Sequence, residues 1–198
     1  MKKSHKGGKV VRTEPVDMHL FEIEPMAREV FQRVGCLSFC QNMQRFHPEV
    51  TRQFALHFDG RRIKVGDLEF EVTEASISAA TGISITGEKW FKAMALSSTY
   101  AKDLLKPEHQ TSDFSKGVPR NQLIEQLDMI LKIIQRYFTC EGRFNTLYQY
   151  HIRSLLHFTS KVEMIIPYYL LRSIGKMSDR IQDKSKDVDF ILYPFGQI

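Results

Sequence analysis

The sequence predicts a mostly helical α+β fold in which a small three-stranded antiparallel meander packs against a helical bundle. Apolar and polar residues alternate between turn signals over residues 53–72, which is typical of short antiparallel strands. Apolar residues recur at helical spacing over residues 120–138, 145–158 and 162–181. Because strands and helices occupy separate parts of the chain, we expect the helices to cover one face of the sheet.

The size and composition of the chain fit one domain. The protein has 198 residues, of which 42% are hydrophobic, including 14 Phe and 7 Tyr, so it can form a substantial core. We expect a disordered basic N-terminal arm over residues 1–15 and a single globular domain over residues 16–198, with a flexible loop at residues 97–118. The last residues, YPFGQI, form no polar tail, which suggests a fragment of a longer protein.

The cysteines and the apolar segments bear on where the protein works. Three cysteines, Cys36, Cys40 and Cys140, and no cleavable hydrophobic leader predict free thiols in a reducing, intracellular compartment. The longest apolar runs, such as residues 164–171, are too short to span a bilayer, so no membrane partner is expected. The net charge of +5 permits binding to nucleic acid or to an acidic surface without requiring it.

Three short strands are predicted between residues 53 and 72. Residues 53–58 alternate in polarity, and Asp59-Gly60 is a hairpin turn signal. The return strand at residues 62–65 leads through the turn Gly66-Asp67 to a third strand at residues 68–72. We expect the apolar side chains of all three strands to face the helices and the charged ones to face solvent.

Short elements are predicted on both sides of the meander. Before it, Pro25 suits the first turn of a helix that Gly35 interrupts and that continues to about residue 44. After it, Thr73 offers its hydroxyl as an N-cap, and Gly82 suits the left-handed end of a short helix. Trp90 is expected to anchor a further short helix.

The end of the chain carries three predicted helices and a strand. Within them, Leu123, Leu127 and Ile134 belong to an apolar stripe and are expected to be buried. Pro167 is compatible with the first turn of the last helix. Residues 190–193 are predicted to form a final strand.

Basic residues gather around the predicted hairpin: Arg52, Arg61, Arg62 and Lys64. Cations beside aromatic residues are able to hold a nucleic-acid backbone while the rings stack on bases. The alternation also allows a second interpretation, in which these cations form a solvated face that protects the strand edges.

Two further motifs allow a specific and a general interpretation. Cys36 and Cys40, with His47 and His57 downstream, raise the question of a zinc site, but their spacing matches no common zinc finger and the cysteines lie among apolar residues. Residues 73–84 resemble the first helix and turn of a helix-turn-helix, but no recognition helix with basic or amide residues follows directly. A plain capped helix packed on the sheet explains the second motif better, because this pattern recurs in many folds that do not bind DNA.

No arrangement of residues predicts catalysis. His151 and His157 lie six residues apart, on nearly opposite sides of one predicted helix. The carboxylates of the third predicted strand alternate with Leu68 and Phe70 and are expected to face solvent. We therefore expect no enzyme activity, and we assign no catalytic residue, cofactor or metal.

Three segments resemble plant transposon-derived proteins, namely the plant transposon protein domains of retroelement open reading frames: VGDLEFEVTEASISAATGISITGEKWF, TCEGRFNTLYQYHIRSLLHF and MIIPYYLLRSIGKM. The pattern Val-Thr-x-x-x-Ile-x-x-x-Thr-Gly at residues 72–82 also looks like the plant mobile domain, in which a strand meets a short helix that ends in a glycine turn. The resemblance covers residues 46–177, and the basic N-terminal arm and residues 99–119 do not match it.

The resemblance implies a plant nuclear protein of mobile-element origin. Relatives of the plant mobile domain are linked to genome stability and silencing, which suits chromatin or protein contacts. The resemblance supplies no catalytic residues, and no acidic triad of a transposase can be placed on the predicted strands.

These observations favour a non-catalytic interaction module of a plant mobile-element-derived protein, which acts in the nucleus through contacts with a protein partner. The alternative is a nucleic-acid-binding module that uses the basic hairpin and the N-terminal arm. Neither the partner nor the oligomeric state follows from the sequence.

Overall fold

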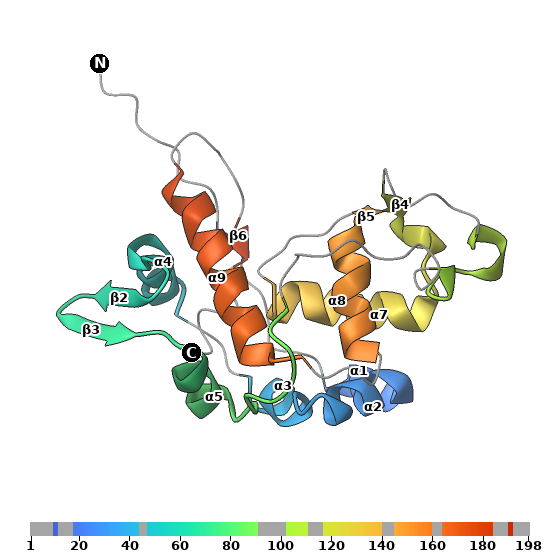
Figure 1. Cartoon of the computed structure of the whole chain (residues 1–198), viewed down its shortest axis with the longest axis horizontal. Coiled ribbons are helices and arrows are strands. Elements are labelled where there is room, and N and C mark those ends of the chain that lie inside the picture. The colour runs from blue at the N-terminus through green and yellow to red at the C-terminus, as the bar shows by residue number, and fades with distance from the viewer. Residues whose placement is uncertain are drawn as a thin grey trace, which may run out of the picture.

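A computed structural model describes most of the chain: residues 10–11, 18–43, 47–90, 102–110, 117–139, 145–159, 164–183 and 190–191. These residues are mostly helical, with two-stranded sheets (Figure 1). The predicted α+β class is therefore confirmed. The predicted three-stranded meander is wrong, because each sheet of the described residues contains two strands.

The N-terminal helices follow the predicted pattern. Helix α1 (His19–Ile23) precedes α2 (Pro25–Arg33), which begins at the predicted proline. Gly35, with φ of 70°, turns the chain before α3 (Leu37–Asn42), as its position in the sequence predicts.

Residues 53–57 form the second half of helix α4 (Pro48–His57), and Phe58 follows its last residue, so the predicted first strand is wrong. Pro48 supplies a favourable first turn, and the His47 side chain accepts a hydrogen bond from the backbone N–H of Val50 at 3.5 Å. Phe54 and Phe58 are four residues apart, so both lie on the buried side of the helix, and Leu56 between them is only partly buried. The spacing of the two aromatic residues fits both a strand and a helix.

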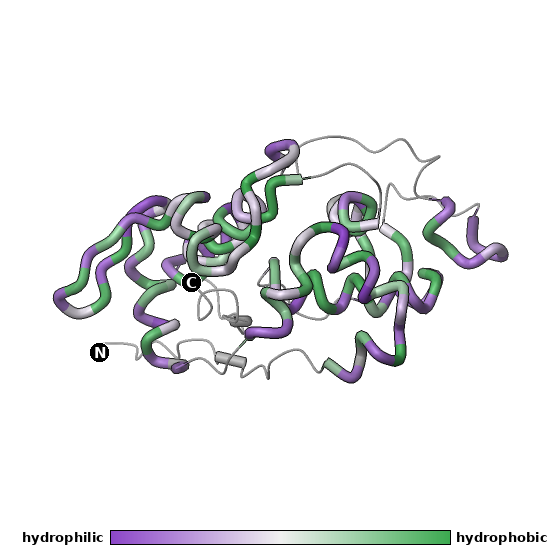
Figure 2. Tube along the Cα trace, turned by 90° about the horizontal axis from the view of Figure 1, so that it is seen from below, coloured by the Kyte–Doolittle hydropathy of each residue, from purple (hydrophilic) through white to green (hydrophobic). Residues whose placement is uncertain are grey.

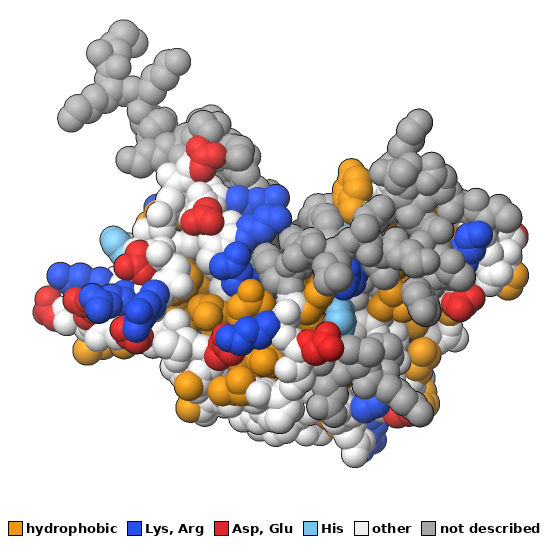
Figure 3. Space-filling model, viewed as in Figure 1, with side chains coloured by type: hydrophobic (Ala, Val, Ile, Leu, Met, Phe, Trp, Pro, Cys, Tyr) orange, Lys and Arg blue, Asp and Glu red, His pale blue; other side chains and the backbone are white. Residues whose placement is uncertain are grey.

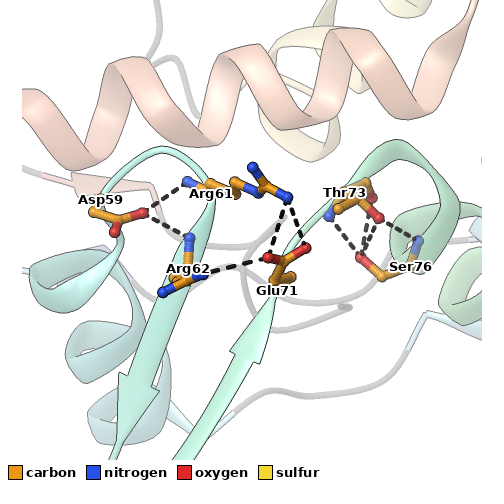
Figure 4. Close-up of polar contacts among 6 residues, drawn as sticks. All are labelled: Asp59, Arg61, Arg62, Glu71, Thr73 and Ser76. Atoms are coloured by element: carbon orange, nitrogen blue, oxygen red, sulfur yellow. Dashed lines mark hydrogen bonds and ion pairs between the residues drawn. The ribbon is translucent and has the colours of Figure 1, made fainter.

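The remaining two predicted strands form an antiparallel hairpin, β2 (Arg62–Val65) and β3 (Leu68–Glu71). The turn at Gly66-Asp67 is confirmed, and Gly66 has a positive φ of 61°. Asp59-Gly60 instead joins α4 to β2. There, the Asp59 carboxylate accepts hydrogen bonds from the backbone N–H groups of Arg61 and Arg62, at 2.9 and 2.6 Å (Figure 4).

The hairpin leads directly into α5 (Glu74–Thr81), whose two ends are as predicted. Thr73 accepts a hydrogen bond from the backbone N–H of Ser76, and the Ser76 hydroxyl accepts one from the backbone N–H of Thr73 (Figure 4). Gly82 ends the helix with φ of 72°. No helix follows within residues 82–90, and the predicted next helix falls mainly on residues outside the described part of the chain.

Three longer helices complete the fold: α7 (Glu125–Tyr137), α8 (Gln149–Thr159) and α9 (Ile166–Gln182). A 3-10 turn at Arg120–Gln122 replaces the predicted start of α7, yet Leu123, Leu127 and Ile134 are all buried, as predicted. In α9 the proline lies in the first turn, which is also as predicted.

Short strands and a 3-10 turn join distant parts of the chain. Strand β4 (Val118–Pro119) pairs with β5 (Thr146–Leu147), and β1 (Val10–Val11) pairs in parallel with β6 (Phe190–Ile191). Most of the predicted N-terminal arm lies outside the described residues. Part of the predicted 97–118 loop is described: it includes a 3-10 turn, Pro107–His109, and buries Leu104 and Leu105 against the helices.

The helices pack in two groups that Figure 1 shows side by side. Helix α9 packs against α4 and α5 at the base of the hairpin, while α2, α7 and α8 pack together. The centre of the second group is aromatic, because Phe31, Phe138 and Phe158 are fully buried with ring centroids 5.5–5.9 Å apart.

A polar contact joins α9 to the end of α4. The Ser178 hydroxyl is buried and lies within hydrogen-bond distance of the carbonyl oxygens of Ala55 and Phe58. The Gln182 amide also donates to the Phe58 carbonyl, at 2.9 Å. These carbonyls lie at the end of α4, where the helix supplies few partners of its own.

We expect the Ser178→Ala substitution to lower the free energy of unfolding by about 1–2 kcal/mol, because it removes a buried hydroxyl that serves two carbonyl groups. Chemical denaturation followed by circular dichroism measures this change. Ser84→Ala is the matched control, since Ser84 is exposed and its hydroxyl lies 2.9 Å from the exposed Thr86 hydroxyl. Equal stability of the two variants would contradict the structural role of Ser178.

Candidate interaction surface on the hairpin

The β2–β3 hairpin extends from one end of the molecule (Figure 1). Its strand β2 lies beside α4, and Ile63 on this strand is only 1% exposed. Strand β3 is exposed along its whole length, although Phe70 still approaches Phe54 of α4, with ring centroids 6.4 Å apart. Figure 2 shows hydrophilic and hydrophobic residues mixed along the hairpin.

The apolar face of the hairpin is covered only in part. Opposite residues of an antiparallel pair share a face, so Ile63 and Phe70 lie on one side with Val65 and Leu68. Leu68 is 70% exposed and Phe70 is 43% exposed, so the predicted burial of these two residues is wrong. The reason is that α4 packs against β2, whereas β3 stays exposed along its whole length.

The other face of the hairpin carries paired charges of opposite sign. Glu71 contacts both Arg61, at 3.2 Å, and Arg62, at 3.7 Å (Figure 4). Lys64 lies directly opposite Glu69 in the strand register. Residues 59–71 therefore contain three cations and four carboxylates, and their surface is not basic overall.

The structure separates the four residues proposed for nucleic-acid contact. Arg61 and Arg62 lie at the base of the hairpin, and Lys64 lies on β2. Arg52 lies on α4, because its segment is helical, and it contacts Glu49 at 3.7 Å. The backbone hydrogen bonds from Arg62 and Arg61 lower the pKa of Asp59, so this carboxylate stays charged beside the two arginines.

The outer edge of β3 is unpaired within the described residues. Because Val72 donates to the Arg61 carbonyl at 2.7 Å, the hydrogen-bonded pairs of the hairpin include Ile63 with Phe70. The N–H and C=O groups of Glu69 and Glu71 therefore point away from β2. No described backbone group bonds to them, and β3 presents an open edge to solvent.

The four residues considered as zinc ligands have separate structural roles. Cys36 and Cys40 are buried, and burial raises the pKa of both thiols, that of Cys40 to about 12. His47 caps α4, and the ring of His57 contacts the Gln53 carbonyl. Across the part of the chain that the structure describes, no three His, Cys, Asp or Glu residues lie close enough together to hold a metal ion.

Trp90 is buried and lies among residues of α8 and α9 that the sequence did not connect to it. Its ring stacks on Tyr169, with centroids 5.7 Å apart, and contacts the His157 ring at 4.5 Å. The Arg153 guanidinium lies over the indole at 5.4 Å. Burial, and to a smaller extent the charge of Arg153, lower the pKa of His157 to about 4.

A row of basic residues on α9 is a second feature that the hydrophobic pattern did not reveal. Arg172, Lys176 and Arg180 are exposed and recur every fourth residue, which places them on one side of the helix. Figure 3 shows Lys and Arg side chains together on the surface where α9 lies. The signal in the sequence is the spacing of the cations rather than of the apolar residues.

The lowered pKa of His157 predicts a pH-dependent stability. The unfolded chain, with a histidine pKa of 6.5, binds the proton more readily than the folded chain between pH 6.5 and about pH 4. We therefore expect the free energy of unfolding to fall as the pH is lowered through this interval. His157→Gln should make this decrease shallower, as measured by denaturation at several pH values. Ser84→Ala, which removes no titratable group and lies at an exposed position, is the control and should leave the profile unchanged.

No helix among the described residues is long and apolar enough to cross a membrane.

Comparisons with known proteins bear on none of these surfaces. Comparison of the chain with protein-family models, with curated proteins and with solved structures found no match. The resemblance to plant transposon-derived proteins therefore stays a prediction.

Proposed function

We propose that the chain is a non-catalytic interaction module that binds a protein partner through strand β3 of its hairpin. The observation that carries this proposal is the exposure of Leu68 and Phe70 on a strand whose outer edge is unpaired among the described residues. Exposed strand edges pair readily with other chains, and soluble proteins usually protect them. An edge that also presents two large apolar side chains is therefore suited to a specific contact.

The anchoring of the hairpin supports the same proposal. Asp59 fixes its first end through two backbone hydrogen bonds, and the Thr73–Ser76 capping box fixes its last end (Figure 4). Helices α4 and α5, which adjoin these ends, both pack on α9. A strand held in this way loses little conformational entropy when a partner binds.

The proposal includes the plant mobile-element origin and nuclear location that the resemblance implies. In support, residues 71–82 place the end of a strand, a capped short helix and a left-handed glycine in succession, which is the arrangement on which the resemblance to the plant mobile domain depends. The module acts there through protein contacts, with no catalytic residue assigned.

We expect the double variant Leu68→Ser, Phe70→Ser to lose partners that the wild-type chain captures. Purified wild-type and variant proteins, immobilised at equal amounts, would be incubated with nuclease-treated plant nuclear extract, and the captured proteins compared by quantitative mass spectrometry. Nuclease treatment separates direct protein contacts from nucleic-acid bridges. Partners that depend on the hairpin should fall about tenfold or more, which corresponds to about 1.4 kcal/mol, because a few anchor residues near the centre of an interface carry most of its binding energy.

Ile23→Ser is the matched control for this experiment, because Ile23 is 59% exposed and α1 lies far from the hairpin in Figure 1. The free energy of unfolding of each variant must also be measured. We expect little change for Leu68→Ser, since a residue that is 70% exposed contributes little to the core. Equal capture by the wild type and the folded double variant would overturn the proposal.

Nucleic-acid binding is the second candidate function, and the row of cations on α9 favours it. Arg61 and Arg62 of the hairpin both contact Glu71, which weakens their attraction for phosphate. Arg172, Lys176 and Arg180 form a line along the exposed side of a seventeen-residue helix, a side that Asp179 shares. Such a line matches the electrostatic requirement for contact with a phosphate backbone.

For this second function, we expect the triple variant Arg172→Gln, Lys176→Gln, Arg180→Gln to bind DNA less tightly than the wild type. The slope of log affinity against log salt should decrease in magnitude by about 2–3, because each cation that neutralises a phosphate releases about one counterion. Fluorescence polarisation at several salt concentrations measures it. The variant Arg61→Gln, Arg62→Gln, Lys64→Gln should have a smaller effect, and no DNA binding by the wild type at low salt would exclude this function.

A further inference from the structure

We infer that the open edge of β3 accepts an extended segment of a partner protein in which basic and apolar residues alternate. This inference rests on the proposed function, and it specifies the chemistry of the partner. Three properties of the hairpin lead to it: the direction of the free backbone groups, the distribution of side chains over its two faces, and the pairing that β3 already makes with β2.

The backbone of β3 is prepared to receive one further strand. Glu69 and Glu71 each direct an N–H and a C=O group away from β2, and no described backbone group bonds to either residue. An extended segment placed along this edge would satisfy these groups and continue the sheet. Leu68 and Phe70 direct their backbone groups toward β2. The backbone hydrogen bonds to an added strand would therefore come from Glu69 and Glu71.

The side chains of β3 determine which segment fits. Leu68 and Phe70 lie on one face of the sheet, and Glu69 and Glu71 lie on the other. An added strand would place its own side chains next to these residues, alternately on the two faces. Apolar residues would extend the contact with Leu68 and Phe70, and lysine or arginine residues would lie beside the carboxylates.

Strand β2 shows that this pattern is complementary to β3. Its sequence, Arg62-Ile63-Lys64-Val65, alternates basic and apolar residues. In the observed register each arginine or lysine lies opposite a glutamate, and each apolar residue lies opposite Leu68 or Phe70. The outer edge of β3 presents the same side chains to an added strand as the inner edge presents to β2.

The charges of β3 disfavour a second copy of this chain as the occupant. Pairing of two β3 strands would bring Glu69 and Glu71 of both copies onto one face, where like charges oppose each other. Strand β2 of a second copy is also poorly available. It lies beside α4, and the Arg62 carbonyl on its outer edge already accepts a hydrogen bond from the Asp59 N–H at 3.1 Å.

Three synthetic peptides of equal length test the inference by fluorescence polarisation with the full chain. The first alternates lysine with valine, and the second alternates glutamate with valine. The third is the lysine peptide in which proline replaces a central residue whose backbone N–H would point toward β3. We expect only the first to bind. The proline peptide keeps the charge but lacks a backbone donor, so its binding would reveal attraction without strand addition.

Charge reversal at Glu69 should change the preference. In the Glu69→Lys variant, affinity for the lysine peptide should fall about fivefold and affinity for the glutamate peptide should rise. Glu108→Lys, at an exposed position of the Pro107–His109 turn, makes the same change in net charge and should leave both affinities unchanged. Equal effects of the two variants would overturn the inference, because they would indicate attraction to the net charge alone.

Backbone amide hydrogen exchange provides a direct readout. Binding of the lysine peptide should slow exchange at Glu69 and Glu71, whereas Leu68 and Phe70, already bonded to β2, should change little. Failure of the peptides to bind, while partner capture still depends on Leu68 and Phe70, would overturn the partner chemistry and leave the proposed function standing. If capture from the extract were also insensitive to these residues, both would be overturned.

Discussion

The packing of α9 against α4 and α5 is the contact on which the rest of the structure depends. The hairpin itself contributes little to the core, because Ile63 is fully covered while all four residues of β3 are exposed. The position of the hairpin is fixed by contacts that the neighbouring helices and the preceding turn make. The Ser178 hydroxyl and the Gln182 amide meet the carbonyl groups at the end of α4, and the bonds made by Asp59 begin β2 shortly afterwards. A hairpin of two strands is marginal alone, so this framework stabilises it.

The sequence predicted the features that depend on local chemistry. Thr73 and Gly82 mark the ends of α5. The Thr73 hydroxyl accepts a hydrogen bond from a backbone N–H three residues later, and Gly82 adopts the left-handed conformation that ends the helix. The start of α2, the turn at Gly66-Asp67 and the burial of Leu127 follow for similar reasons. These predictions needed no knowledge of what lies across the fold.

The failures have a different origin, because they concern contacts between distant segments. Phe54 and Phe58 fit either a strand or a helix, and the packing of the segment on α9 decides for the helix. The alternation of Leu68 and Phe70 correctly predicted which residues share a face, but not that α4 stops short of covering them. The candidate nucleic-acid residues show the same limit, since the pairing of Arg61 and Arg62 with Glu71 depends on the strand register. The row of cations on α9 became apparent only with the helix in place.

The surroundings of Trp90 give the protein an optical property of its own. This residue is the only tryptophan of the chain, and its indole lies between Arg153 and His157 of α8 and Tyr169 of α9. Light emitted by the indole is therefore sensitive to the separation of these two helices and to the charge on the neighbouring imidazole. The hairpin lies outside this environment. The fluorescence of Trp90 therefore reports the separation of α8 from α9. It does not report the binding of a partner to β3.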